Sequence, residues 1–495
     1  MPEASQPRSV HAFVDDALGT DDATALAQRV RQRQISALEL TEAAISRAEA
    51  VDAQIGGLAT ADYDRARELA RGLDRQDPDA RPGFFSGVPT LLKDNVDLEG
   101  LPTGHGSAAV PKTIARSTSP FARQLLDQGF VCLGKSALPE FGFNATTEPA
   151  HGAPTRNPWH LGYSTGASSG GSAALVAAGV VPVAHANDGG GSIRIPAACC
   201  GLVGMKPSRG RLVANDAART LPINILNDGI VSRSVRDTAH FLSQADAQSR
   251  ARDLPPISAL EGPSGKTFRI GMVLDSINGH TTDADTRAAV ERTARCLERL
   301  GHRIEPVAVP VADSFPEDFA LYWAFLAFGV RANGHRLLAP GFDKRRVDDL
   351  THGLADHFKR QFYRLPGVLW RLRQSRRDYA RAMAGFDAVL TPVLGHTTPE
   401  IGYLSPTLPF DTLFARLTRY VGFTPLANAT GAPAVAVPAG LSRNRLPVGV
   451  QLMGRYGGEQ TLLDLAFALE ADAPWPQLYQ SEALAQAGET LDATS

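Results

Sequence analysis

The chain has 495 residues, of which 43% are apolar and 21% are charged, a composition typical of a folded globular protein with a sizeable core. Lys and Arg together number 50 and Asp and Glu 52, so the charge gives no reason to expect a nucleic-acid partner. Because the sequence has no uncharged apolar run of about 18 residues and no apolar core of signal-peptide type near Met1, we expect no membrane span and a cytoplasmic location.

The first eighty residues are predicted to be helical. Ser36 and Glu39 have the spacing of a capping box, and apolar residues recur at helical spacing after them. A second helix is expected from Tyr63 to Leu73.

The next stretch alternates strands and helices. Strand character is expected at Val88–Leu92 and Phe130–Leu133, on either side of a helix over Phe121–Gln128 that ends at a glycine. A region rich in small residues then predicts a helix over Ser172–Ala178 and a strand over Val180–Ala184.

The second half begins with a β-α-β pattern, followed by a helical stretch over residues 312–380 with aromatic-rich faces. The predicted elements of this half are the strands Phe268–Leu274, Arg303–Val309, Ala388–Thr391, Ala434–Val437 and Gly449–Met453, and the helix Ala284–Leu300. This alternation predicts an α/β fold.

The four cysteines do not have the spacing of a metal-binding knuckle. Cys132, Cys199, Cys200 and Cys296 are therefore expected to be buried, reduced thiols. We predict neither a metal nor an organic cofactor.

Two familiar motifs occur in contexts that do not suit them. Residues 129–136 match the P-loop pattern, but the residues between the glycines are apolar and strand-like, and a helix precedes them. Residues 166–170 match the G-x-S-x-G elbow of α/β-hydrolases, but no strand is expected before them and no histidine downstream has a distinctive setting. Neither nucleotide binding nor a Ser-His-Asp hydrolase is favoured.

Several glycine- and serine-rich segments together resemble the amidase signature family. The central ones are Gly166–Ser172 and Asn187–Pro196. The similarity extends to Gly87–Asp94, Lys135–Glu140, Thr155–Trp159, Gly201–Pro207 and Pro447–Gln451. Such a long ordered match covers nearly the whole chain.

The resemblance implies a central mixed β-sheet covered by helices on both faces. It implies residues 81–480 as the catalytic domain, with 312–380 as a variable helical region near the substrate pocket, residues 1–80 as an N-terminal helical region and 481–495 as a tail. It also implies a catalytic triad in which Ser192 is the nucleophile, Ser168 is a bridging serine after a cis peptide bond and Lys93 is the base.

This assignment is chemically reasonable, because a serine hydroxyl needs an adjacent base and a lysine is a base only when neutral. Burial among apolar neighbours would lower the lysine pKa. Negative charge on the substrate carbonyl oxygen needs donors, and we expect an oxyanion hole made by the backbone N–H groups of Gly189, Gly190, Gly191 and Ser192.

Supporting roles are expected for three more residues. Ser169 is expected to donate a hydrogen bond near the triad. Asp188 and Arg194 flank the nucleophile, and the sequence leaves open an ion pair that braces the loop or a contact with substrate. Ala167, Asn187 and Gly189 differ from the commonest family pattern, which has glycine, threonine and a bulkier residue there.

The predicted function is therefore hydrolysis of C–N bonds in small or aryl amides, with carbamates and esters as further candidates, through an acyl-enzyme on Ser192. The partner is a small-molecule amide, and a homodimer is compatible with the resemblance. The alternative within the family is a glutaminase-type subunit of a tRNA-dependent amidotransferase. The alternative outside it is a binding protein with a degenerate site.

Overall fold

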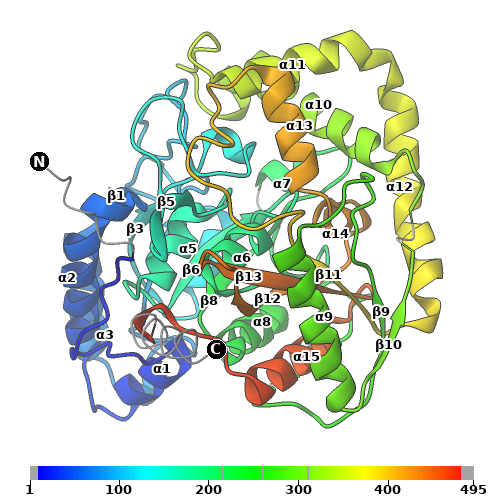
Figure 1. The fold of residues 1–495 in the computed structure, drawn as a ribbon. Coiled ribbons are helices and arrows are strands. Elements are labelled where there is room, and N and C mark those ends of the chain that lie inside the picture. The colour runs from blue at the N-terminus through cyan, green and yellow to red at the C-terminus, as the bar shows by residue number, and fades with distance from the viewer. Residues whose placement is uncertain (1–8, 215, 259, 309–310, 481–495) are drawn as a thin grey trace, which may run out of the picture.

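The computed structural model describes residues 9–214, 216–258, 260–308 and 311–480. A mixed sheet of eight strands, in the order β10-β9-β11-β13-β12-β7-β8-β6, forms its centre (Figure 1). β9 runs parallel to β10 and β11, and the other neighbours are antiparallel. The strands are β6 (Val183–Asp188), β7 (Val203–Lys206), β8 (Asn227–Ser232), β9 (Arg269–Met272), β10 (Arg303–Pro306), β11 (Ala388–Pro392), β12 (Ala434–Leu441) and β13 (Pro447–Gly454).

A second sheet of three strands, in the order β1-β3-β2, lies against the β6 edge of the large sheet. Two side-chain contacts join β2 to β6: Thr90 Oγ1 donates to the Val183 carbonyl at 3.0 Å, and the Lys93 N–H donates to His185 Nδ1 at 3.2 Å. The outer strands are β1 (Leu58–Ala61), β2 (Pro89–Lys93) and β3 (Val131–Ser136), and a separate hairpin consists of β4 (Arg156–Asn157) and β5 (His160–Ser164).

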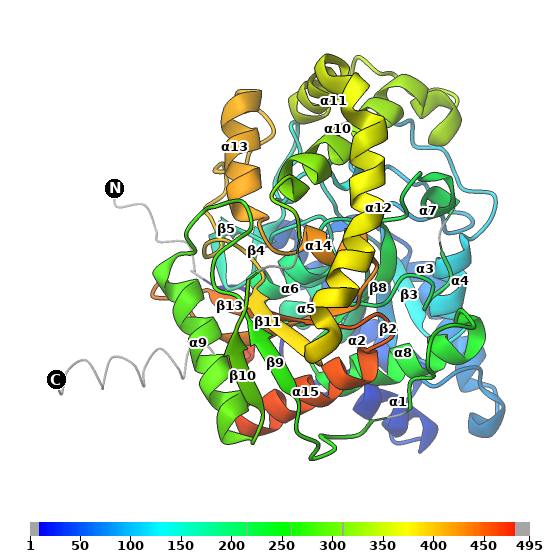
Figure 2. The same ribbon diagram turned by 90° about the vertical axis from the view of Figure 1, so that its right-hand side faces the viewer.

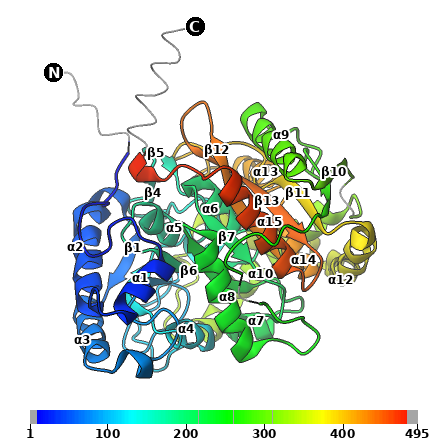
Figure 3. The same ribbon diagram turned by 90° about the horizontal axis from the view of Figure 1, so that it is seen from below.

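Helices cover both faces of the central sheet. α8, α15 and α9 are neighbours on one face, where α8 and α15 cross the sheet in Figure 3, while α5 and α6 pack together on the other face. The N-terminal helices lie beside the small sheet. The bounds are α1 (Ala23–Arg31), α2 (Ala37–Ile55), α3 (Tyr63–Asp74), α4 (Pro120–Leu126), α5 (Gly170–Ala177), α6 (Arg194–Cys200), α7 (Asp216–Thr220), α8 (Val235–Ser249), α9 (Ala284–Arg299), α14 (Pro425–Thr430) and α15 (Glu459–Asp472).

Four further helices form a cap over the sheet. α10 (Phe315–Leu337), α11 (Asp349–Gln361) and α13 (Phe410–Tyr420) gather at the top of Figure 1, and α12 (Leu365–Ala382) runs from them down the side of the sheet in Figure 2. The buried Glu140 carboxylate fixes the start of α11, because it accepts from the Asp348 N–H at 2.7 Å and from Thr351 Oγ1 at 2.8 Å. The cap is therefore tied to the loops that follow β3.

The predicted α/β class and the mixed sheet are confirmed, as is the Ser36–Glu39 capping box at the start of α2. The cysteines are buried and free. Residues 129–136 are a glycine after α4 followed by β3, and Lys135 Nζ is buried against the Pro102 carbonyl and Thr103 Oγ1, at 2.8 and 2.6 Å. Among the described residues, no helix is both long and apolar enough to cross a bilayer.

Three local predictions were wrong. The first eighty residues contain a strand, β1, which pairs with β3, so this region is not purely helical. The strand expected at 180–184 is β6 and lies later, at 183–188, because buried polar residues end it and hide its pattern. A short strand, β5, does precede residues 166–170, where none was expected, and α5 follows them.

Candidate active site

Lys93 ends β2, and its ammonium nitrogen is fully buried among three oxygen atoms. Its Nζ lies 2.7 Å from Ser168 Oγ, 3.0 Å from Ser169 Oγ and 2.7 Å from Asn187 Oδ1. Burial lowers the pKa of Lys93 to about 7, although the carboxylates of Asp228 and Asp188 act in the opposite direction. A large fraction of Lys93 is thus uncharged near neutral pH.

Ser168 lies in the turn between β5 and α5, and the peptide bond from Ala167 to Ser168 is cis, as expected. Gly142 packs against this serine from the other side: a Cβ built on Gly142 would lie 2.9 Å from Ser168 Oγ. The hydroxyl is thus confined between Gly142 and Lys93.

Ser169 connects the lysine to the loop that carries Ser192. Its Oγ donates to the Ser192 carbonyl at 2.6 Å while it accepts from Lys93. Since Ser192 immediately precedes α6, this contact sets the position of its backbone relative to Ser168. The structure thus brings Lys93, Ser168, Ser169 and Ser192 into one region.

Asp188 and Arg194 form a bidentate ion pair with both side chains fully buried, at 2.9 Å for Nε and 3.0 Å for Nη2. The Asp188 carboxylate also accepts from the N–H groups of Gly191 and Ile193, at 2.7 and 3.2 Å. Burial acts to raise the pKa of Asp188, but Arg194 and its other donors hold it at about 2. The pair therefore braces the loop, which is one of the two roles that the sequence left open.

The glycine N–H groups before Ser192 are not equivalent. The Gly191 N–H is already donated to Asp188, so it does not face a substrate while this hydrogen bond is formed. The N–H groups of Gly189, Gly190 and Ser192 have no acceptor among the described residues. This differs from the expectation of four equivalent donors.

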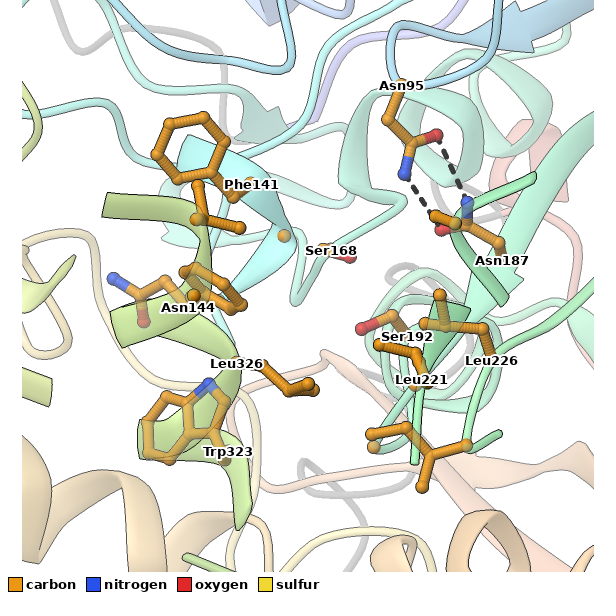
Figure 4. Close-up of a pocket in the computed structure, with 18 of the residues that line it drawn as sticks. Asn95, Phe141, Asn144, Ser168, Asn187, Ser192, Leu221, Leu226, Trp323 and Leu326 are labelled. Carbon is orange, nitrogen blue, oxygen red and sulfur yellow. Dashed lines mark hydrogen bonds between the residues drawn. The ribbon is translucent and has the colours of Figure 1, made fainter. Parts of the chain in front are cut away.

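A cavity of about 1430 Å³ opens beside the two serines, and Ser168 and Ser192 both line it. Figure 4 shows Asn95 and Asn187 above Ser192, with Phe141, Trp323 and Leu326 on the opposite wall. Most of the lining is apolar. One face of α10 therefore forms a wall of the cavity, while Tyr322 on another face is buried and donates to the Ile223 carbonyl at 2.7 Å.

Sequence reasoning missed two asparagines and a histidine. Asn187 accepts from Lys93, and its side-chain amide pairs reciprocally with that of Asn95, at 3.1 and 3.3 Å. His185, expected only to pack, accepts from the Lys93 N–H and faces Asp228 at 3.2 Å. The departure of Asn187 from the usual threonine was the signal that pointed to this region.

No group of three or more His, Cys, Asp and Glu side chains arranged to hold a metal ion occurs in the part of the chain that the structure describes. The site consists of hydroxyl, amine, amide and backbone groups.

The match to known proteins covers most of the chain. A family model described as "Amidase" matches residues 39–463. "Putative amidase AmiC" of Mycobacterium tuberculosis is 46% identical over 471 residues, which cover 95% of this chain and 98% of that protein.

Two solved structures are similar over their whole length. A structure of 6-aminohexanoate cyclic dimer hydrolase complexed with substrate has a TM-score of 0.81 and 30% identity, covering 94% of this chain and 100% of that one. A bacterial aryl acylamidase of the amidase signature family has a TM-score of 0.80 and 26% identity, covering 93% and 98%.

The fold and these matches define a hydrolase of amide bonds. The chain belongs to the amidase family, whose members are called amidase signature enzymes.

Proposed function

We propose that Ser192 is the nucleophile of this amidase, that Ser168 relays its proton and that Lys93 is the base. The observation that carries the proposal is the 2.7 Å contact between the Lys93 Nζ and Ser168 Oγ atoms beside a cavity that both serines line. A buried lysine with a pKa near 7 is suited to this task, because general bases work best near the operating pH.

The reaction proceeds through an acyl-enzyme. Ser192 Oγ attacks the amide carbon as its proton passes to Ser168 Oγ and the Ser168 proton passes to Lys93. The same relay in reverse protonates the leaving nitrogen, the C–N bond breaks, and the acyl group stays on Ser192 as an ester. Water then attacks this ester by the same proton path, which releases the acid and restores Ser192.

The negative oxygen of the tetrahedral intermediate needs donors, and we propose the N–H groups of Gly189, Gly190 and Ser192. These groups are open among the described residues, and the buried Asp188–Arg194 pair holds the loop that presents them. Preorganised backbone donors of this kind are typically worth ~10²–10³ in turnover each.

The substrate that the cavity suits best is an amide with a bulky, uncharged acyl or aryl group. Phe319, Trp323 and Leu326 offer apolar and aromatic surface opposite the serines. The aryl acylamidase and the cyclic dimer hydrolase named above are consistent with such substrates. Carbamates and esters present the same carbonyl to Ser192 and belong to the candidates.

The alternative is a glutaminase-type subunit of a tRNA-dependent amidotransferase. It has less support, because the similar proteins described above are named as amidases or hydrolases and not as such subunits. Hydrolysis of a chromogenic anilide by the isolated chain supports the amidase; glutamine hydrolysis only with an added partner supports the alternative.

The nucleophile is tested with a fluorophosphonate probe and peptide mapping. We expect covalent labelling at Ser192, loss of labelling and of anilide hydrolysis in Ser192→Ala, and a loss of ~10²–10⁴-fold in Ser168→Ala and Lys93→Met. Ser405→Ala, outside the cavity lining, is the matched control. Undiminished hydrolysis by Ser192→Ala would contradict the proposal.

A further inference from the structure

The hydrogen-bond partners of Lys93 limit where its protons can be. A neutral lysine has two N–H donors and one lone pair, yet the Lys93 Nζ has three oxygen partners. One of these three oxygens must therefore donate a proton to the nitrogen, and the other two must accept from it. Which oxygen donates decides whether Lys93 can act as a base toward Ser168.

Two of the three oxygens can only accept in the arrangement seen. Asn187 Oδ1 is a carbonyl oxygen and has no proton. The single proton of Ser169 Oγ is directed to the Ser192 carbonyl, at 2.6 Å, the shortest of its contacts. The two N–H bonds of neutral Lys93 are thus used by Asn187 and Ser169, and the lone pair is left for the Ser168 hydroxyl.

Given the catalytic roles proposed above, on which this inference rests, we infer that Asn187 is a positioning residue that directs the lone pair of Lys93 toward the hydroxyl of Ser168. Asn187 touches no reacting atom and acts through Lys93. After the proton transfer, the resulting ammonium has three N–H donors and three acceptors, so the same arrangement also satisfies the charged form.

Asn95 completes the device. Its amide pairs with that of Asn187 through two hydrogen bonds, so Asn187 Oδ1 accepts from both Lys93 and Asn95 and its two lone pairs are used. Figure 4 shows this amide pair at the edge of the cavity. Asn95 is only half-buried there, so it holds the Asn187 amide without being part of the core.

The charges around Lys93 come from other elements and are accounted for. Asp188 lies at the end of β6 and is paired with Arg194, and Asp228 on β8 faces His185 of β6. Both carboxylates raise the Lys93 pKa, while burial lowers it further than they raise it. Asn187 is the uncharged member of this surrounding, so a charge placed there has a direct readout.

The test measures the rate at which a fluorophosphonate labels Ser192 as a function of pH, which needs no knowledge of the substrate. Asn187→Asp places a carboxylate against Lys93 and raises its pKa. Since only the neutral lysine activates Ser192, we expect the rising limb to move up by at least about one pH unit and the rate at pH 7 to fall about tenfold. Asn187→Leu leaves the lone pair undirected, and we expect the high-pH plateau to fall about tenfold.

The matched control is Asn444→Asp, which makes the same exchange on the exposed turn between β12 and β13, with no movement of the limb expected. An unmoved limb in Asn187→Asp, or a full plateau in Asn187→Leu, overturns the inference. If either variant fails to fold, Asn95→Ala replaces it, with an expected plateau loss of about fivefold and an unchanged plateau as the overturning result. Absence of labelling at Ser192 in the unaltered protein overturns the proposed function instead, so the two failures are distinguishable.

Discussion

The Asp188 carboxylate and the Arg194 guanidinium form a bidentate pair in which neither side chain has any contact with solvent. Arg194 also donates to Gln451 Oε1 and Asn428 Oδ1, at 2.5 and 2.8 Å, so it joins the loop before α6 to β13 and α14. Through Asp188 this network holds the backbone of residues 189–193, the segment that carries Ser192. The position of the proposed nucleophile thus depends on charges that do not touch substrate.

Replacing this arginine is expected to be costly. Arg194→Met leaves Asp188 buried without its cation, and loss of one member of a buried pair typically destabilises a protein by about 3–5 kcal/mol. Urea unfolding measures the change in the free energy of unfolding. Arg345→Met, which removes an exposed partner of Asp343, is the control and is expected to change it by less than about 1 kcal/mol. Equal effects of the two substitutions would contradict the bracing role.

Activity is expected to rise with pH through the pKa of Lys93. The lysine must be uncharged to accept a proton, and burial lowers its pKa to about 7, so kcat/KM for an anilide is low below pH 6 and reaches a plateau above pH 8. A pH profile measured with stability checked at each pH gives the midpoint. A midpoint near the ordinary lysine value of about 10.4 would show that Lys93 is not the base.

A methyl group beside the bridging serine is expected to disturb the relay. In Gly142→Ala the new Cβ would lie 2.9 Å from Ser168 Oγ, at a residue whose φ of +73° also disfavours a side chain. We expect kcat to fall by about 10²-fold, because small displacements of catalytic groups are that costly. Gly72→Ala, on α3 with open space around its Cβ position, is the matched control and should retain full activity. Normal turnover by Gly142→Ala would argue against a confined Ser168.

The cavity wall formed by α10 is expected to select bulky substrates. Trp323→Ala removes aromatic surface that lines the cavity, and KM for an anilide with a large acyl group should rise about tenfold, while KM for a small aliphatic amide changes little. Trp370→Ala removes a tryptophan that is 62% exposed on α12 and serves as the control. Equal changes for large and small amides would mean that Trp323 does not contact the acyl group.

Much of the site could be predicted from sequence because its residues lie in recognisable order along the chain. The glycine and serine segments around Ser168 and Ser192, and Lys93 after an apolar run, indicated the residues that the fold brings together. The elements with strong periodicity, such as the helix that became α9, were also found with nearly correct ends.

The sequence by itself determined the α/β class, the family resemblance and the identity of the lysine and serines, since these follow from local pattern and residue type. Only the tertiary structure decided that Asn187 and Asn95 surround Lys93, that Asp188 occupies the Gly191 N–H, and that β5 precedes Ser168. The reason is that a hydrogen bond depends on direction and distance between groups that are up to 94 positions apart in the chain, as for Lys93 and Asn187, and no local pattern encodes that geometry.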